Sequence, residues 1–283
     1  MKYFVFSDVH GFYNELKEAL DKAGFDENNP EHMLISCGDN FDRGNQNVKM
    51  FDFLKKMYNK NKIVLIKGNH EDLLIECLKR GIAYRHDISN GTFNTILQFG
   101  SLVFPQKNSF EMLETDFDVL CDSIYNDTDL VSFINNHFID YFETKKFVFT
   151  HGFIPLKVKD GVDASLYTEK TIPVEYNPNW RDASLKEWYN ARWLNGMEEV
   201  VLKRNRIPDK TIVVGHFHTA YGNVRQKYGW DMNKSIAYQH EFYDNSEDFF
   251  RPFVAPGIVA IDACTAYTQK VNVYVIEDEP LGK

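Results

Sequence analysis

The stretch GDNFDRG at residues 38–44 follows directly on the apolar run 33–37. A short apolar run that ends at a glycine indicates a buried strand opening into a loop. Carboxylates are hard oxygen ligands for divalent metal ions, and the planar guanidinium of arginine matches a phosphate group. We therefore predict that Asp39 binds metal and Arg43 binds phosphate, although this stretch alone fits a solvated surface turn equally well.

The same order of strand, polar loop and helix occurs three times within the first eighty residues. Apolar runs at residues 3–6, 33–37 and 63–66 each lead into a polar loop and then into apolar positions at helical spacing. This alternation predicts a parallel sheet with right-handed crossovers. The three loops should lie side by side at one edge of the sheet, where α/β proteins build their sites.

The pattern changes beyond residue 80. Residues 81–145 combine helical spacing with scattered Phe, Asp and Asn, so we expect a mainly helical insertion in a single domain spanning residues 1–283. The stretch 225–256 is polar and aromatic, and it is compatible with a pocket rim or an edge hairpin. Two last strands are expected at residues 258–263 and 271–276, as antiparallel neighbours.

The bulk composition argues against some classes of function. The chain has 283 residues, 43% of them hydrophobic, and a formal net charge of -9. Binding to nucleic acid or to an anionic membrane surface needs a basic face, so we expect neither partner. Four cysteines without a CxxC pair indicate a reducing compartment. The sequence shows no signal-peptide pattern and no run of ~20 apolar residues, so a cytoplasmic location is the default expectation.

Five strand-like runs end in side chains that bind metal ions, the runs at residues 147–150 and 211–214 being the last two. Some candidates have a plain structural alternative, such as a helix N-cap for Asp8 or a solvated loop position for His10. Five such sets in one structural context favour a metal site. Carboxylate, imidazole and amide donors together suit Mn²⁺, Fe or Zn²⁺. The candidate ligands are Asp8, His10, Asp39, Asn69, His151, His216 and His218.

These residues resemble the calcineurin-like metallophosphoesterases, and more closely their phosphoprotein-phosphatase branch. The matching motifs are DxHG at residues 8–11, GDxxDRG at 38–44, GNHE at 68–71, HG at 151–152 and GHxH at 215–218. The resemblance implies an α/β fold, a four-layer αββα sandwich of two sheets flanked by helices, with two metal ions at the sheet edge. The motifs are specific for the superfamily but not for a substrate.

The resemblance also implies a role for each matching residue. The implied ligands are Asp8 and His10 for one metal ion, Asn69, His151 and His216 for the other, Asp39 as their bridge, and His218 as a further ligand of the first ion. The phosphatase branch often lacks the counterpart of His218. In the same scheme His70 is the general acid, Asp42 orients it, and Arg43 binds phosphate.

A second phosphate-binding arginine near a tryptophan is often present in that branch. Here the region contains Arg192 and Trp193, but Arg192 is displaced relative to the pattern, and Asn195 is an alternative occupant of its place. We expect Arg192 either to bind phosphate or to be a structural surface arginine.

The chemistry of such a site follows from its metal ions. Two ions roughly 3.5–4 Å apart can hold a bridging hydroxide together with phosphoryl oxygens, because metal coordination lowers the pKa of water towards 7. In-line attack of the hydroxide on phosphorus needs a proton for the leaving alkoxide, which His70 can donate. Two divalent ions, Mn²⁺ first with Fe or Zn²⁺ as alternatives, are therefore the expected cofactors.

We predict a metal-dependent phosphomonoesterase of the serine/threonine phosphatase type, with a phosphoprotein or a nucleotide as its phosphorylated substrate. The alternative is hydrolysis of dinucleoside polyphosphates such as diadenosine tetraphosphate, which a bacterial branch with the same motifs performs. A third hypothesis is an inactive fold used as a binding scaffold. That hypothesis predicts eroded ligand positions, whereas every motif position is filled here.

Overall fold

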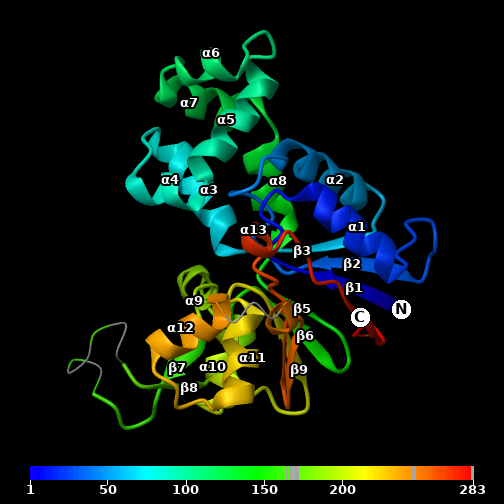
Figure 1. Ribbon diagram of the computed structural model, residues 1–283, viewed down its shortest axis with the longest axis vertical. Coiled ribbons are helices and arrows are strands. Elements are labelled where there is room, and N and C mark those ends of the chain that lie inside the picture. Colours follow the sequence, from blue (N-terminus) through cyan, green and yellow to red (C-terminus); the bar gives the residue numbers. More distant parts are fainter. Residues whose placement is uncertain (164, 166–167, 169–171, 244–246, 282–283) are drawn as a thin grey trace.

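The computed structural model describes residues 1–163, 165, 168, 172–243 and 247–281. Two five-stranded β-sheets pack against each other, and helices lie outside each of them (Figure 1). This arrangement is the four-layer αββα sandwich that the resemblance to the metallophosphoesterases implies.

The first sheet has the strand order β12-β1-β2-β3-β4. Its strands are β1 (Lys2–Phe6), β2 (His32–Ser36), β3 (Ile63–Ile66), β4 (Phe138–Ile139) and β12 (Tyr274–Glu277). Strands β1 to β4 are parallel, and β12 runs antiparallel to β1. The predicted parallel arrangement of the first three strands is therefore confirmed.

The second sheet has the strand order β10-β11-β9-β6-β5. Its strands are β5 (Phe142–Glu143), β6 (Phe147–Phe149), β9 (Thr211–Val214), β10 (Phe253–Ala255) and β11 (Ile258–Ala260). The three central strands are parallel, and the two edge strands are antiparallel to their neighbours. A separate hairpin consists of β7 (Leu156–Val158) and β8 (Val174–Tyr176).

The prediction that the last two strands are neighbours is wrong. Strand β11 pairs with β9 and β10, whereas β12 pairs with β1 in the other sheet. A loop and the short helix α13 (Thr265–Thr268) connect the two strands and carry the chain from one sheet to the other. Both runs contain strands, as their patterns predict. Their partners could not be predicted locally, because pairing depends on which strands elsewhere in the chain have an unpaired edge.

The alternation of side chains along β1 explains the layers. Tyr3 and Val5 pack between the two sheets, whereas Phe4 and Phe6 pack into the cluster under the outer helices. Successive residues of a strand point to opposite faces, so a strand buried on both faces is apolar throughout. Phe149 and Val213 of the second sheet complete the layer between the sheets.

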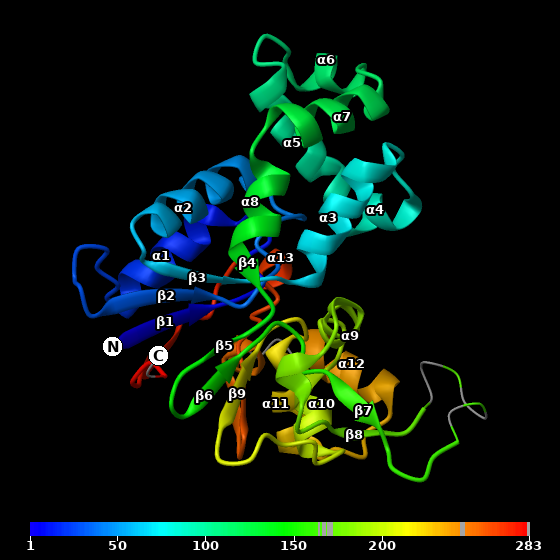
Figure 2. The same ribbon diagram turned by 180° about the vertical axis from the view of Figure 1, so that it is seen from behind.

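Helices from the first half of the chain lie on the outer side of the first sheet, and α4 to α7 extend away from it (Figure 1). They are α1 (Tyr13–Ala23), α2 (Asn47–Asn59), α3 (Asn69–Arg80), α4 (Arg85–Asn90), α5 (Thr92–Val103), α6 (Ser109–Leu113), α7 (Phe117–Asp127) and α8 (Leu130–His137). Helices α4 to α8 occupy most of the segment predicted as a helical insertion. Figure 2 shows α5, α6 and α7 together at one end of the molecule.

Shorter helices accompany the second sheet. They are η2 (Trp180–Asp182), α9 (Leu185–Ala191), α10 (Gly196–Val201), α11 (Thr219–Tyr228), α12 (Lys234–Tyr243) and η3 (Glu247–Phe250). The stretch 225–256, left open from sequence, is therefore mostly helical, and its residues 244–246 lie outside the described residues. Among the helices described, none is both long and apolar enough to cross a bilayer.

Candidate active site

The three polar loops after β1, β2 and β3 lie against one another. The backbone N–H groups of Asp8 and His10 donate to the carbonyl oxygens of Gly38 and Asp39, each at 3.0 Å. A Cβ atom on Gly38 would lie only 2.6 Å from the backbone nitrogen of Gly68 in the third loop. Only glycine allows this approach, so the loops meet at one sheet edge as predicted.

Backbone strain is concentrated in these loops. Six residues that carry candidate functional side chains have positive φ angles, a conformation that costs non-glycine residues roughly 1 kcal/mol each. Such strain persists only where the surrounding structure enforces it, and it clusters at functional sites. The six are Asp8 (54°), His10 (50°), Asp39 (54°), Asp42 (75°), Arg43 (59°) and His216 (64°).

Glu71 holds the second and third loops together. Its Oε2 accepts hydrogen bonds from the backbone N–H groups of Asp39 at 3.0 Å and Gly68 at 2.8 Å. Its Oε1 accepts one from the backbone N–H of Asn40 at 2.8 Å. The sequence analysis gave Glu71 no role. The available signal was its place in the GNHE motif, three residues after Gly68, where an acidic side chain can accept hydrogen bonds from backbone N–H groups at a helix start.

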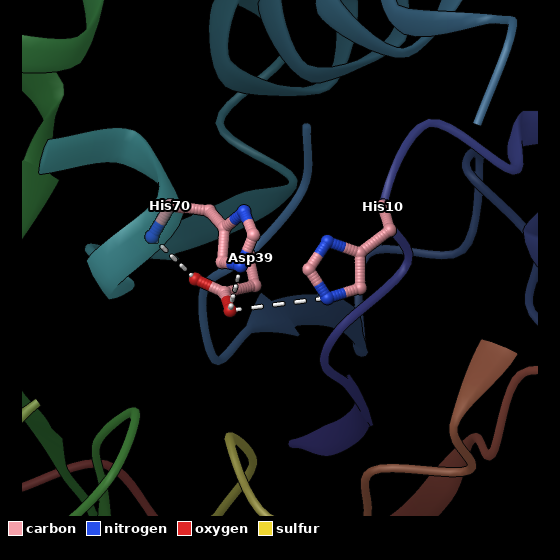
Figure 3. Close-up of side chains that lie close together, drawn as sticks. All are labelled: His10, Asp39 and His70. Carbon is pink, nitrogen blue, oxygen red and sulfur yellow. Dashed lines mark hydrogen bonds and ion pairs between the residues drawn. The ribbon is translucent and has the colours of Figure 1, made fainter. Parts of the chain in front are cut away.

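Asp39 lies at the centre of the site. Its Oδ2 is 3.9 Å from Nε2 of both His10 and His70, and Figure 3 shows both rings beside this carboxylate. Its Oδ1 is 3.3 Å from Nε2 of His151. Two groups of side chains that could each hold a metal ion share Asp39, one with His10 and His70, the other with His151 and His216.

The imidazole rings are anchored as metal-binding histidines are. Nδ1 of His10 donates to the carbonyl oxygen of Phe41 at 2.9 Å, and Nδ1 of His151 donates to that of Cys37 at 2.7 Å. Metal-ligating histidines usually donate their second ring N–H to a carbonyl or carboxylate, which fixes ring orientation. Both anchored rings therefore direct Nε2 towards Asp39, and the donor set fits a divalent cation.

The charges of the site also fit a cation. Burial and the neighbouring carboxylate of Asp262 raise the pKa of Asp8 well above its usual value. Burial lowers the pKa of His151, but Asp39 outweighs it and raises that pKa to about 10. A buried acid without sufficient positive charge nearby is unfavourable, and a metal ion supplies that charge.

His216 has the protonation state of a metal ligand. Burial, followed by the charge of His151, lowers the pKa of His216 to about 3. Its imidazole is therefore neutral near pH 7, as coordination requires.

Three other predicted ligands lie outside the two groups. Oδ2 of Asp8 accepts hydrogen bonds from the Ser7 hydroxyl at 2.5 Å and the His216 backbone N–H at 2.9 Å. Oδ1 of Asn69 lies 2.8 Å from Nε2 of His151, which brings these two predicted ligands together. His218 stands immediately before α11 and belongs to neither group. Its role as a ligand stays a prediction.

His70, Asp42 and Arg43 form a second cluster beside Asp39. Nδ1 of His70 donates to Oδ2 of Asp42 at 2.7 Å, and both side chains are buried. Nη2 of the exposed Arg43 lies 3.3 Å from Nε2 of His70. Burial lowers the pKa of His70, but the carboxylates of Asp39 and Asp42 outweigh it and raise that pKa. A proton donor and a guanidinium thus lie next to the potential metal site.

Arg192 is buried rather than on the surface, with an exposed fraction of 6%. Its Nη1 donates to Oδ2 of Asp72 at 2.8 Å, and its Nη2 donates to Asp140. Asp72 also pairs with Lys67 at 2.7 Å. The guanidinium is thus held by two carboxylates, while Asn195 caps α10 through a hydrogen bond from the Glu198 backbone N–H. Phosphate binding by Arg192 stays a prediction.

The sheet topology, the shared carboxylate and the anchored histidines correspond to one protein family. The family model described as calcineurin-like phosphoesterase matches residues 1–220. The chain belongs to the calcineurin-like phosphoesterase family. The two groups around Asp39 are the candidate metal-binding residues of this family member.

Curated relatives within this family carry two kinds of name. The chain is 34% identical over 85 residues to bis(5'-nucleosyl)-tetraphosphatase PrpE [asymmetrical] of Bacillus velezensis, a match covering 28% of this chain and 34% of the relative. It is 33% identical over 79 residues to serine/threonine-protein phosphatase 2 of Escherichia coli, covering 28% and 33%. The chain therefore spans about a third of the length of the curated relatives it matches, and the two names leave its substrate open.

Solved structures agree on the fold. The cold-active protein-tyrosine phosphatase of a psychrophilic Shewanella species has a TM-score of 0.51 and 16% sequence identity. This match covers 98% of the present chain and 75% of the other. At this identity, the likeness concerns the fold alone.

Proposed function

We propose that this phosphoesterase hydrolyses phosphate monoesters at a two-metal site centred on Asp39. The observation that carries the proposal is the sharing of Asp39 by two potential metal-binding groups, next to the His70–Asp42 pair and Arg43. A shared carboxylate between two clusters of imidazoles is the arrangement a bridged metal pair needs. The substrate class we favour is a phosphoserine or phosphothreonine ester.

The two groups around Asp39 and the motif positions support the proposed ligand assignment. Divalent ions bound here supply Lewis-acid activation of water and neutralise phosphate charge. Mn²⁺ is the preferred ion, with Fe or Zn²⁺ as alternatives, because the donors are mixed oxygen and nitrogen. The proposed ligands are Asp8, His10, Asp39, Asn69, His151, His216 and His218.

The remaining residues handle the phosphate and the proton. Arg43 is exposed beside the buried ligands, so its guanidinium can bind two phosphoryl oxygens of an entering substrate. That contact would draw Arg43 away from Nε2 of His70, which then faces the leaving oxygen. His70 gives that oxygen its proton, while Asp42 holds the opposite ring nitrogen and favours the charged imidazole.

Dinucleoside polyphosphate hydrolysis is the second candidate. Trp193 has an exposed fraction of 42%, and its ring centroid lies 5.8 Å from that of His216. An exposed aromatic face beside the proposed ligands offers a stacking surface for a nucleobase. The PrpE relatives, named as tetraphosphatases, provide the second reason to test this substrate.

A substrate panel on Mn²⁺-loaded protein tests both candidates. We expect hydrolysis of p-nitrophenyl phosphate and of a phosphoserine peptide, with the rate lowered at least 100-fold in Asp39→Asn and His70→Asn. Asp52→Asn, an exposed carboxylate on α2, is the matched control and should retain the wild-type rate.

Each outcome of the panel assigns the function. Release of nucleotide from diadenosine tetraphosphate without peptide dephosphorylation would replace the first candidate by the second. Wild-type rates in both site variants would refute the assigned site. A protein that cannot be loaded with metal and hydrolyses nothing would be the scaffold of the third hypothesis.

A further inference from the structure

Helix α5 begins against the loop that carries the proposed catalytic pair. The hydroxyl of Thr92, the first residue of α5, donates to Oδ2 of Asp42 at 2.7 Å. Nδ1 of His70 donates to the same oxygen, also at 2.7 Å. Thr92 and Asp42 both have exposed fractions of 0%. The segment between β3 and β4 thus reaches directly into the proposed proton-donating pair.

The Thr92 hydroxyl does not stabilise its own helix. Serine and threonine at helix starts usually cap the helix by accepting a backbone N–H. Here Gly91 occupies the N-cap position with φ of 90°, and the helix has no side-chain cap. The hydroxyl is therefore available to Asp42, and a local structural role does not explain its position.

The same helix supports the backbone of the catalytic loop. A Cβ atom on Gly91 would lie 2.3 Å from the backbone nitrogen of Arg43, so the helix start packs directly on the loop. Gln98 donates from Nε2 to the carbonyl oxygen of Gly44 at 3.0 Å. Its Oε1 accepts from the backbone N–H of Asn47 at 2.9 Å.

Asp42 depends on few partners for its orientation. In the described part of the chain, its Oδ1 is buried without a hydrogen-bond partner. The two hydrogen bonds on Oδ2, from Thr92 and His70, are therefore what fix the rotation of the carboxylate. Removing the Thr92 hydroxyl leaves the carboxylate held only by the ring that it is supposed to orient.

We propose that Thr92 is a positioning residue that orients Asp42, and through it His70, for proton donation to the leaving group. The proposal rests on the proposed function of His70 as general acid. Proton donation requires the donor within about 3 Å of the leaving oxygen, and small misplacements lower the rate strongly. The Thr92 hydroxyl bonds to Asp42, so Thr92 acts through that carboxylate rather than on the substrate.

Leaving-group dependence is the readout that a merely structural role would not change. The leaving group of phenyl phosphate is phenolate, whose conjugate acid has a pKa of about 10, so its departure needs a proton. Dinitrophenyl phosphate has a much better leaving group and needs none. We expect Thr92→Val to lower kcat for phenyl phosphate roughly 10-fold and to change kcat for dinitrophenyl phosphate less than about twofold.

Two further variants separate orientation from packing. Thr92→Ser keeps the hydroxyl and should restore most of the rate on phenyl phosphate. Thr95→Val is the matched control, because Thr95 is equally buried on α5 but its hydroxyl donates to the carbonyl oxygen of Gly91 at 3.2 Å. We expect Thr95→Val to change kcat for phenyl phosphate and for dinitrophenyl phosphate by the same factor. Metal content and the thermal unfolding midpoint of each Mn²⁺-loaded variant report whether the fold and site remain intact.

His70→Asn, measured beside these variants, separates this inference from the proposed function. Selective loss on phenyl phosphate in His70→Asn but not in Thr92→Val would overturn the role of Thr92 alone. Absence of selectivity in His70→Asn would overturn the general-acid role on which the inference rests. Equal losses on both substrates in Thr92→Val, with an intact metal content, would also overturn the positioning role.

Discussion

Oδ1 of Asp39 accepts a hydrogen bond from the backbone N–H of His70 at 2.9 Å. His70 is the second residue of α3, whose N-cap is Gly68. Asp39 therefore caps this helix from a loop 31 residues earlier in the chain. A carboxylate at this place satisfies an unpaired N–H group and interacts favourably with the helix dipole. The proposed bridging ligand thus also holds the helix that carries His70.

This double role predicts different effects for two substitutions of Asp39. We expect Asp39→Ala to lower the free energy of unfolding of the metal-free protein by about 1 kcal/mol more than Asp39→Asn. The asparagine retains an oxygen that can accept the helix N–H, whereas both variants lose the bridging carboxylate. Urea unfolding of chelator-treated protein measures the difference, and equal values for the two variants would contradict the capping role.

Metal binding should raise stability. A ligand present at 100 times its dissociation constant stabilises the native state by about 2.7 kcal/mol. We expect EDTA to lower the thermal unfolding midpoint of the wild-type protein and Mn²⁺ to restore it. The midpoint of Asp39→Asn should respond to neither, while the control Asp52→Asn should behave as wild type. A midpoint of the wild type that is independent of Mn²⁺ would argue against the site.

Glu143 predicts a dependence of stability on pH. Its Oε1 accepts from Nε of Arg181 at 2.6 Å, and its Oε2 accepts from Nζ of Lys210 at 2.7 Å. Burial raises the pKa of Glu143, but these hydrogen bonds outweigh it and hold the pKa below its usual value. The stabilisation that Glu143 gains from these hydrogen bonds is therefore complete above its pKa of about 4.3 in the unfolded chain. It is lost as the pH falls through the lower pKa of Glu143 in the folded protein.

Glu143→Gln tests the sign of this dependence. The variant should lose stability at pH 7, and the difference from wild type should shrink as the pH falls below about 4. Denaturant unfolding at several pH values measures it, with the exposed Glu277→Gln as a control of small effect. A difference that grows on acidification would refute the assigned direction.

Arg192 distinguishes a structural role from phosphate binding. Removing one partner of a buried ion pair is strongly destabilising, so we expect Arg192→Met to lower the free energy of unfolding by about 3 kcal/mol. Partial recovery is expected when Asp72→Asn is added, because the uncompensated buried carboxylate is then neutral. In folded Arg192→Lys, a raised KM for phosphate esters would indicate phosphate binding, and an unchanged KM would limit Arg192 to the ion-pair network.

Trp193 tests the nucleotide hypothesis. If a nucleobase stacks on its exposed ring, Trp193→Ala should raise KM for diadenosine tetraphosphate roughly 10-fold and leave that for p-nitrophenyl phosphate nearly unchanged. Leu185→Ala is the control, since Leu185 lies on the neighbouring helix α9 with an exposed fraction of 83%. A KM that rises equally for both substrates would indicate a disturbed site rather than base stacking.

The sequence by itself determined most of the strands and the kind of chemistry. Apolar runs such as 63–66 can be recognised as strands because a short apolar run that leads into a glycine-containing loop is a local property of the sequence. Parallel strands bring their carboxyl ends to one edge, so the sequence predicts that Asp39 and His10 lie at one site. The resemblance to calcineurin-like phosphoesterases rests on the same loops and was confirmed by the family match.

Only the tertiary structure decided which distant groups meet. Strand β12 lies in the first sheet, Arg192 reaches Asp72 across 120 residues, and Thr92 reaches Asp42 across 50. The local sequence pattern carries no information about such contacts, because it shows which face of a helix a hydroxyl or guanidinium lies on but not which distant group packs there. Hydrogen-bonding partners depend on the packed fold, because buried polar groups must find partners among the groups that the fold brings near them.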